Sequence, residues 1–384
     1  MKYNHLANYF FCRGFFCEKK LNFAVAMDDT CFFRKTVADW YAANGRDLPW
    51  RRTRDPYLIW VSEIILQQTQ VAQGLDYYCR FVAHFPDVRS LAAAPIDEVL
   101  KLWQGLGYYS RARNLHASAQ QVVGRFGGRF PHCYADVRSL KGVGEYTAAA
   151  ICSFAFRLPF ATVDGNVYRV LARYFGIDCP IDTTAGKKRF AELAQMLLDK
   201  AQPDLHNQAL MEFGALQCTP VAPRCVSCPL AASCAALAAG CVAELPRKQG
   251  KTQVSDRYFN YIFAEFEGKI WLHHRSANDI WRGLYELPLI ETSDLCPAES
   301  VLALDEFNKI TGSQCFTLAK VTPVRKHVLS HRRIFARCLV LRLAQPAHFD
   351  GCIEIAIDRL DEFPISRLME RLLTDVFSDK TDAD

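Results

Sequence analysis

The chain has 384 residues, which predicts two or three domains and excludes a peptide, a fibre or a disulfide-stapled mini-protein. Half of the residues are hydrophobic and 23% are charged, a balance that excludes an intrinsically disordered chain. Lysine and arginine number 46 against 41 aspartate and glutamate, so the net charge of +5 is too small to indicate a polyanionic partner without local clusters of basic residues.

The N-terminal segment, residues 1–26, mixes aromatic side chains with scattered charges. It lacks the continuous apolar core and the small-residue cleavage site of a secretory signal. We therefore expect residues 1–30 to form a disordered extension, with Met27 as a candidate start. The longest uncharged run, residues 225–243, contains Pro229 and is rich in alanine, so we expect no membrane span.

Two patterns of hydrophobicity divide the rest of the chain. Over residues 31–240, apolar residues recur at intervals of three and four, and proline or glycine interrupts them, which predicts an all-α region. Residues 241–255 form a basic, polar linker. Over residues 256–378, strand-like runs alternate with helix-like stretches, which predicts a separate α+β domain.

Residues 57–71 form a predicted helix, and Glu63 shares one face of it with Ile59, Trp60 and Leu66. A carboxyl group beside such apolar side chains has a raised pKa, so it can stay protonated near neutral pH and act as a general acid. The periodicity by itself favours a simpler interpretation, a surface glutamate on an amphipathic helix.

Two glycine-containing tracts are candidates for DNA contact. Residues 105–114 combine glycines with Tyr108, Arg111 and Arg113, a mixture suited to holding a DNA backbone and wedging between bases. Gly142 and Gly144 precede a helix whose N-terminal N–H groups suit a phosphate. Each tract also has a purely structural interpretation. Residues 105–114 can be a turn before a solvated helix start, and Gly142 and Gly144 can belong to a helical hairpin without a ligand.

Asp164 precedes a predicted helix over residues 167–175, where aspartate is a favoured N-cap. Because a helix N-terminus favours the charged form, we expect Asp164 to stay ionised while Glu63 does not. Cleavage of a glycosidic bond requires such a pair, since one group protonates the leaving group and the other stabilises positive charge on the sugar.

Four cysteines within residues 218–234 have the spacing of metal ligands, and nearby prolines prevent a continuous helix there. Four thiolates suit either tetrahedral zinc or a 4Fe-4S cluster, and the presence of one Cys-x-x-Cys pair favours iron–sulfur without excluding zinc. Most of the other twelve cysteines are isolated, which indicates a reducing, cytoplasmic compartment. The expected ligands are Cys218, Cys225, Cys228 and Cys234.

These motifs, in this order, resemble those of the MutY-type adenine DNA glycosylases of the helix-hairpin-helix superfamily, over residues 31–375. The resemblance implies an all-α helix-hairpin-helix region with an iron–sulfur loop, followed by an α+β Nudix-like domain. It implies removal of adenine paired with 8-oxo-guanine or guanine in double-stranded DNA, by hydrolysis of the N-glycosidic bond. It also implies one 4Fe-4S cluster on the four cysteines, and we expect a monomer.

By match to the family motifs, Glu63 would protonate adenine N7 and Asp164 would stabilise the charge that develops on the sugar. The side chains expected to line the adenine pocket are Arg51, Tyr146 and Asn166. The residues expected to contact DNA, fill the gap left by the base or wedge beside the oxidised guanine are Gln67, Gln68, Tyr108, Arg111, Arg113, Gly142 and Gly144.

One position separates neighbouring branches of the superfamily. In the glycosylase/lyases similar to endonuclease III, the residue two after the second hairpin glycine is a lysine that forms a Schiff base with the sugar, whereas this chain has Tyr146. We therefore expect direct hydrolysis by an activated water, with weak or no strand cleavage. The rival functions are a lyase for oxidised pyrimidines, a lesion-binding protein without catalysis, and a nucleotide pyrophosphohydrolase.

The C-terminal half, with its motif at residues 279–288, resembles the Nudix-fold recognition domain of this family. It lacks the glutamate-rich run that binds magnesium in Nudix pyrophosphohydrolases, which implies recognition rather than catalysis. Leu329, Ser330 and His331 match the loop that reads 8-oxo-guanine, although the family usually carries phenylalanine where Leu329 stands. The alternative is a β-hairpin whose serine and histidine face solvent.

Overall fold

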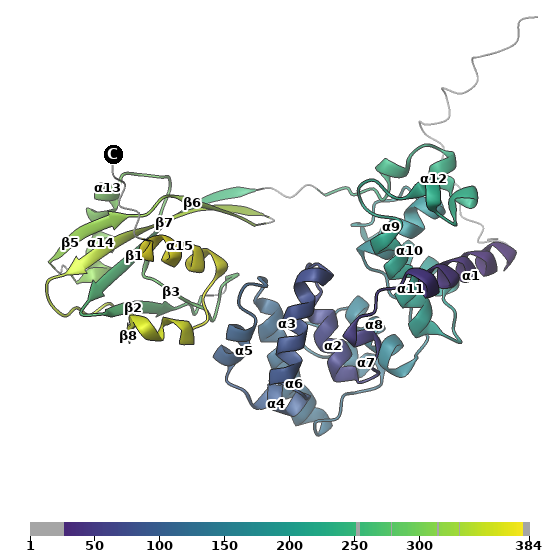
Figure 1. Ribbon diagram of the computed structural model, residues 1–384, viewed down its shortest axis with the longest axis horizontal. Coiled ribbons are helices and arrows are strands. Elements are labelled where there is room, and N and C mark those ends of the chain that lie inside the picture. The colour runs from purple at the N-terminus through teal and green to yellow at the C-terminus, as the bar shows by residue number, and fades with distance from the viewer. Residues whose placement is uncertain (1–26, 251–253, 278, 313–314, 330, 379–384) are drawn as a thin grey trace, which may run out of the picture. The chain divides into compact units, whose positions relative to one another are not determined.

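The computed structural model describes residues 27–250, 254–277, 279–312, 315–329 and 331–378 (Figure 1). Of the disordered extension predicted for residues 1–30, residues 1–26 lie outside the described residues, as does Ser330. The prediction is wrong for residues 27–30, which form the start of a helix that continues to Asn44. The chain divides into two compact units. The first comprises residues up to 64 together with residues 129–250, and the second comprises residues 65–128 together with residues 251–384.

The first unit is helical, and its core includes side chains from four different helices, among them Phe33, Leu171, Phe190 and Phe213. Burying an aromatic or leucine side chain contributes about 1.5–3 kcal/mol, so this cluster dominates the packing of the unit. Its helices are α1 (Met27–Asn44), α2 (Pro56–Ile65), α7 (Tyr134–Arg138), α8 (Glu145–Phe156), α9 (Gly165–Tyr174), α10 (Thr184–Leu197), α11 (Pro203–Leu216) and α12 (Ala235–Ala238), with short 3-10 helices at Pro49–Arg51, Cys225–Ser227, Ala231–Ser233 and Val242–Glu244.

The starts of three of these helices follow from local sequence. Asp164 caps α9, since its side chain accepts hydrogen bonds from two backbone N–H groups at the helix start. Thr183 caps α10 in the same way, by accepting from the N–H of Gly186. Helix α11 begins with Pro203, whose missing N–H would have had no partner in the first turn. Asp164 thus lies at a helix N-terminus, as the sequence predicts.

The single helix predicted over residues 57–71 is wrong in extent. Helix α2 ends at Ile65, and α3 begins at Val71. Between them, Gln68 adopts a positive φ of 54°, which a right-handed helix cannot accommodate. The backbone N–H of Thr69 donates to the carbonyl of Leu66 and closes a tight turn. Periodicity cannot reveal this break, because the apolar pattern continues through the turn.

The second unit begins with four helices, α3 (Val71–His84), α4 (Val88–Ala93), α5 (Ile96–Leu102) and α6 (Ser110–Phe126). Leu91, Trp103 and Leu115 are buried. Helix α6 ends at Phe126 and is followed by Gly127, whose φ of 61° is left-handed and therefore suits glycine.

The rest of the second unit is built on an eight-stranded sheet, in which β1 and β7 pair in parallel and the other pairings are antiparallel. The order along the main path is β3-β2-β1-β7-β5, with β4 on β1, β6 on β7 and β8 on β2. The strands are β1 (Ser255–Phe266), β2 (Lys269–His274), β3 (Tyr285–Glu286), β4 (Leu289–Thr292), β5 (Phe316–Val321), β6 (Arg325–Val328), β7 (Arg332–Leu343) and β8 (Cys352–Ala356).

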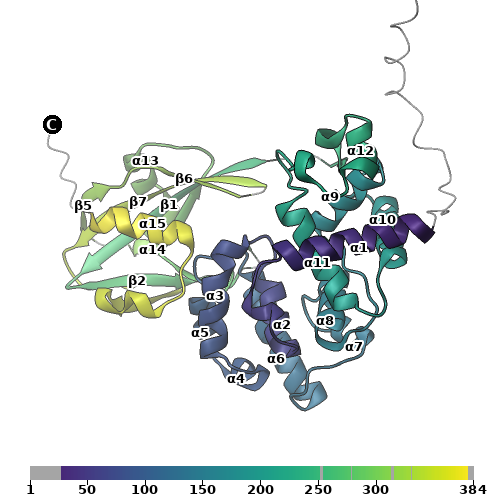
Figure 2. The ribbon, with the colours of Figure 1, turned by 45° about the vertical axis from the view of Figure 1, so that its right-hand side comes forward.

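Helices pack on both faces of this sheet. Ile262 of β1 packs in one core with Phe307 of α14 (Asp305–Thr311), which follows α13 (Ala298–Leu302). The next residue, Phe263, points to the opposite face and contacts Phe377 of α15 (Arg367–Phe377), which lies along the sheet in Figure 2. The alternation along β1 explains why both faces are apolar. A 3-10 helix, η5 (Ile357–Glu362), precedes α15.

Within the ranges that the structure describes, none of the helices combines the length and the apolar character needed to cross a bilayer. The helical region followed by a sheet-containing region is the fold class that the sequence predicts.

Candidate active site

Glu63 lies on α2 with only 7% of its surface exposed. Burial raises the pKa of its carboxyl group to about 7, because removal from water penalises the charged form. A hydrogen bond with the Tyr146 side chain and the charge of Arg51 oppose this rise, whereas the charge of Asp164 adds to it. The structure thus brings four of the predicted site residues together, and Glu63 can hold a proton near neutral pH.

Asp164 lies in a different environment although it is also enclosed. Burial raises the pKa of its carboxyl group above the usual value, and hydrogen bonds oppose that rise without cancelling it. The carboxylate accepts from the backbone N–H groups of Asn166 (2.9 Å) and Val167 (2.8 Å) and from the Asn166 side-chain amide (2.7 Å). These three donors favour the charged form, so they oppose the effect of burial on Asp164.

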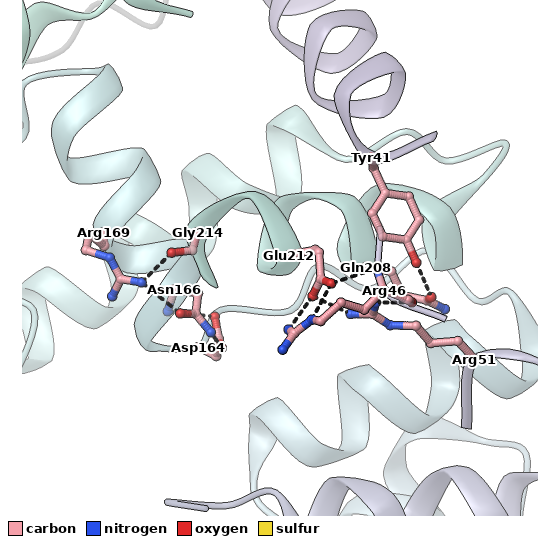
Figure 3. Close-up of polar contacts among 9 residues, drawn as sticks. All are labelled: Tyr41, Arg46, Arg51, Asp164, Asn166, Arg169, Gln208, Glu212 and Gly214. Atoms are coloured by element: carbon pink, nitrogen blue, oxygen red, sulfur yellow. Dashed lines mark hydrogen bonds and ion pairs between the residues drawn. The ribbon is translucent and has the colours of Figure 1, made fainter. Parts of the chain in front are cut away.

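Arg51, expected in the adenine pocket, is held by a buried acid on α11. Its Nη2 atom lies 2.7 Å from Oε2 of Glu212, which Arg46 also contacts through two guanidinium N–H groups (Figure 3). Burial raises the pKa of Glu212, but the hydrogen bonds from Arg46 and Arg51 outweigh burial and lower it to about 2. Glu212 is therefore ionised, and it fixes the guanidinium of Arg51.

Asn166 is oriented from both ends of its amide. Its Nδ2 group donates to Asp164, and its Oδ1 atom accepts from Nη2 of Arg169 at 2.8 Å (Figure 3). Arg169 also donates to the backbone carbonyl of Gly214 at 2.6 Å. A side chain at position 214 would place its Cβ 2.7 Å from the backbone oxygen of Asn166, so only glycine allows α11 to approach this closely.

The glycine hairpin forms a tight turn before α8. Gly142 has a left-handed φ of 77°, whereas Gly144 has an ordinary extended backbone and open space around its Cα. The turn is closed by Arg138, which donates to the carbonyl of Val143 at 2.8 Å. The backbone therefore requires glycine at position 142, and phosphate binding by the hairpin stays a prediction.

The four cysteines of residues 218–234 line one cavity of about 30 Å³. Arg173 donates to the sulfur of Cys218 at 3.4 Å and anchors the loop through the carbonyl of Thr219 at 2.8 Å. Among the side chains that the structure describes, no group of three or more His, Cys, Asp or Glu is arranged around a single metal ion. Four cysteine thiolates are nevertheless the ligand type of a 4Fe-4S cluster, and all four cysteines line this one cavity.

The chain matches known families over both of its halves. A model of the HhH-GPD superfamily base excision DNA repair proteins matches residues 61–196, and a NUDIX domain model matches residues 261–375. The adenine DNA glycosylase of Buchnera aphidicola subsp. Baizongia pistaciae is 37% identical over 266 residues, which cover 67% of this chain and 74% of that protein. The chain belongs to the adenine DNA glycosylase family.

A second relative agrees with this membership, and a solved structure agrees with the predicted helical fold. The adenine DNA glycosylase of Buchnera aphidicola subsp. Acyrthosiphon pisum is 32% identical over 318 residues, which cover 83% of this chain and 88% of that protein. The structure of a thermostable thymine-DNA glycosylase is 32% identical, with a TM-score of 0.51, and covers 54% of this chain and 96% of that chain. The sequence-based resemblance to adenine DNA glycosylases is confirmed.

The predicted DNA-contacting residues of the second unit lie in turns and on α6. Gln68 is exposed, and the Tyr108 side chain is 51% exposed. Arg111, in contrast, is 8% exposed, so the alternative of a solvated helix start is wrong at this position. Arg113 donates to the carbonyl of Arg282 at 2.6 Å, and burial lowers the pKa of its guanidinium. Phosphate contacts by the two arginines stay predictions.

Two of the predicted lesion-reading residues, Leu329 and His331, lie between β6 and β7. The backbone N–H of Leu329 donates to the carbonyl of Arg332 at 2.8 Å. Leu329 is half-buried and His331 is exposed, whereas Ser330 lies outside the described residues. A β-hairpin is the element that the alternative interpretation expected, and lesion reading stays a prediction.

Two important residues, Glu212 and Arg169, were missed by the sequence analysis. Each lies in a stretch whose helical periodicity predicts a packed helix. Neither belongs to a motif whose spacing indicates a catalytic or ligand-binding site. The available signal was a single acid within the otherwise apolar segment at residues 209–216, since a buried acid requires a cationic partner.

Proposed function

We propose that the protein is an adenine DNA glycosylase, which removes adenine paired with 8-oxo-guanine or guanine by hydrolysing its N-glycosidic bond. The observation that carries this proposal is the pair of carboxyl groups, Glu63 with a pKa of about 7 and Asp164 with three donors to its charged form. Membership of the adenine DNA glycosylase family supports adenine as the base.

In the proposed mechanism, Glu63 gives its proton to N7 of the extruded adenine, so that the base leaves as a neutral molecule. The ionised Asp164 lies on the sugar side and stabilises the oxocarbenium-like charge. Tyr146 holds the Glu63 carboxyl through its hydrogen bond, and Arg51 is held ready for the base by Glu212. Since position 146 carries no amine, water completes the reaction and the enzyme is monofunctional.

One 4Fe-4S cluster is proposed on Cys218, Cys225, Cys228 and Cys234, which line one cavity. When bound, such a cluster can stabilise the loop that carries it and can exchange an electron. The chain's own contribution is Arg173, whose guanidinium faces the sulfur of Cys218 and ties the loop to α9.

The proposed partner is double-stranded DNA that contains the mispair, bound by a monomer in a reducing compartment. The turn at Gly142 and Gly144, at the N-terminus of α8, would hold a phosphate of the backbone. The hairpin tip with Leu329 and His331 would contact the base opposite adenine.

The decisive experiment is single-turnover base release from three duplexes, carrying adenine opposite 8-oxo-guanine, adenine opposite guanine, and an oxidised pyrimidine. Adenine release from the first two, with no covalent complex after borohydride treatment, is expected. Glu63→Gln should abolish release while DNA binding persists, and the exposed Glu192→Gln serves as the matched control. Release of the oxidised pyrimidine with a trapped complex would establish the lyase instead, and unchanged release by Glu63→Gln would exclude this mechanism.

A further inference from the structure

Two loops of the second unit are joined by the guanidinium of one buried arginine. Loop A comprises residues 66–70, between α2 and α3, and loop B comprises residues 103–109, between α5 and α6. Arg111, in the first turn of α6, is 8% exposed and reaches both loops. It lies three residues after Tyr108 in sequence and more than forty after Gln68.

The contacts are divided between the two ends of the guanidinium fork. Nη1 donates to the carbonyl oxygen of Gln67 in loop A at 2.6 Å and to that of Ile65, the last residue of α2, at 2.8 Å. Nη2 donates to the carbonyl oxygens of Gly107 at 3.1 Å and Leu106 at 3.4 Å in loop B. A planar fork can serve two sets of acceptors at once, which the single ammonium of lysine cannot do.

Both loops carry a residue in a strained backbone conformation next to these contacts. Gln68 has a φ of 54° and Tyr108 a φ of 48°, in the left-handed region that only glycine adopts readily. Among the described residues, five non-glycine positions have a positive φ, and two of the five flank this one guanidinium. Such a conformation persists only where its surroundings fix it, and here the carbonyl before each strained residue is an acceptor of Arg111.

The same guanidinium also packs against aromatic rings of loop B. Its central carbon lies 5.3 Å from the ring centre of Trp103 and 5.7 Å from that of Tyr108. The indole N–H of Trp103 donates to the carbonyl of Gly107 at 3.2 Å, so loop B is fixed on a second side. Gln68 and the ring of Tyr108 remain exposed at the surface. The backbones of the two loops are thus held by buried contacts, while the side chains of Gln68 and Tyr108 stay accessible to a ligand.

We propose that Arg111 is a positioning residue, which holds loops A and B as one rigid element so that Gln68 and Tyr108 enter the DNA together. This inference rests on the proposed function, because it concerns how the duplex is opened. It replaces the predicted phosphate contact of Arg111 with an indirect role.

The physical advantage is pre-organisation. Extruding a base requires side chains that occupy the gap and wedge the neighbouring stack. Two independent loops would each lose conformational freedom when they insert, and that loss opposes extrusion. Because both loops are fixed before binding, their conformational freedom is already lost during folding. The side chains of Gln68 and Tyr108 then reach the DNA at a fixed distance from each other.

Two substitutions at position 111 distinguish positioning from phosphate contact. Arg111→Lys keeps the charge but cannot fork between the loops, so positioning predicts base release slowed by roughly 10–100-fold at saturating enzyme. Phosphate contact predicts near-normal release for this variant. Arg111→Gln removes the charge, and positioning predicts an unchanged slope of log affinity against log salt, whereas phosphate contact predicts a slope reduced by about 1. The exposed Arg125→Gln, in the last turn of α6, is the matched control.

A double-mutant cycle with Tyr108→Ala tests the coupling directly. If Arg111 acts through loop B, adding Arg111→Lys to Tyr108→Ala slows release little further than Tyr108→Ala alone. If the double variant instead slows base release by the product of the two single-variant factors, the residues act independently and the proposal is overturned. Should both Arg111 variants fail to fold, Thr69→Val removes the weaker acceptor at 3.3 Å in loop A, and a smaller loss of release in the same direction is expected.

Fluorescence of 2-aminopurine at the target position reports extrusion separately from chemistry. Arg111→Lys should lower the amplitude of extrusion, while Glu63→Gln should not. Normal release and normal extrusion in all Arg111 and Thr69 variants would overturn this inference and leave the proposed function standing. Absence of adenine release by the unmodified protein would instead overturn the proposed function.

Discussion

Glu63→Gln should stabilise the folded protein at alkaline pH, because the native carboxyl group is costly to ionise. Its pKa is raised from the usual 4.5 to about 7 by burial. Between these two values the folded state binds a proton that the unfolded state has lost, so the free energy of unfolding falls as pH rises through this window. Above pH 7 the full loss has accumulated, and it amounts to about 3 kcal/mol.

Glutamine is neutral at every pH and has nearly the shape of the protonated acid, so the variant escapes this loss. Its gain over the unmodified protein is expected to be under about 1 kcal/mol near pH 5 and about 3 kcal/mol near pH 8. Urea unfolding at the two pH values measures the gain, and the exposed Glu192→Gln should show none. A gain that is equal at both pH values, or a destabilisation that grows with pH, would refute the raised pKa.

The remaining predictions concern the neighbours of the two carboxyl groups. Tyr146→Phe removes a hydrogen bond that lowers the pKa of Glu63, so the alkaline limb of the pH–rate profile for base release should move to higher pH. Tyr134→Phe is the control, and a move to lower pH would contradict this. Glu212→Gln leaves Arg46 and Arg51 without their carboxylate partner, so it should lower the free energy of unfolding in urea by about 3–5 kcal/mol. An unchanged free energy of unfolding would exclude the proposed anchoring of Arg51 by Glu212. Gly214→Ala should displace Asn166 and slow base release with about 1–3 kcal/mol lost from stability, and unchanged kinetics would count against the orientation of Asn166. Cys225→Ser should lower bound iron, measured by elemental analysis, and Cys241→Ser should not; equal iron in both would exclude Cys225 as a ligand.

The sequence predicts those parts of the site whose residues lie close together in short motifs. Asp164 follows from cap chemistry, since the residue type and the helix start are adjacent in the chain. The four cysteines follow from their spacing, and the alternation of strand-like and helix-like runs predicts the C-terminal sheet. Glu63 is predictable only in part. The sequence predicts the helical face on which it lies, but its burial and its hydrogen bond with Tyr146 involve residues that are distant in sequence.

Contacts between distant segments are what the sequence does not reveal. Glu212 meets Arg46 across more than 160 residues, and no local pattern marks either partner. At the break in the helix after Ile65, the carbonyls of Ile65 and Gln67 accept hydrogen bonds from Arg111, which lies in another helix. An arginine beside glycines and tyrosines is typical of DNA contact, and only the fold shows that this one is buried.

The most direct test of the account is the titration of the two carboxyl groups themselves, followed by NMR of protein labelled at the carboxyl carbons and assigned with Glu63→Gln and Asp164→Asn. The account predicts that Glu63 loses its proton near pH 7 and that Asp164 is already ionised at that point. A Glu63 signal that titrates near its usual value of 4.5, or an Asp164 that ionises after Glu63, would contradict the assignment of acid and charged partner.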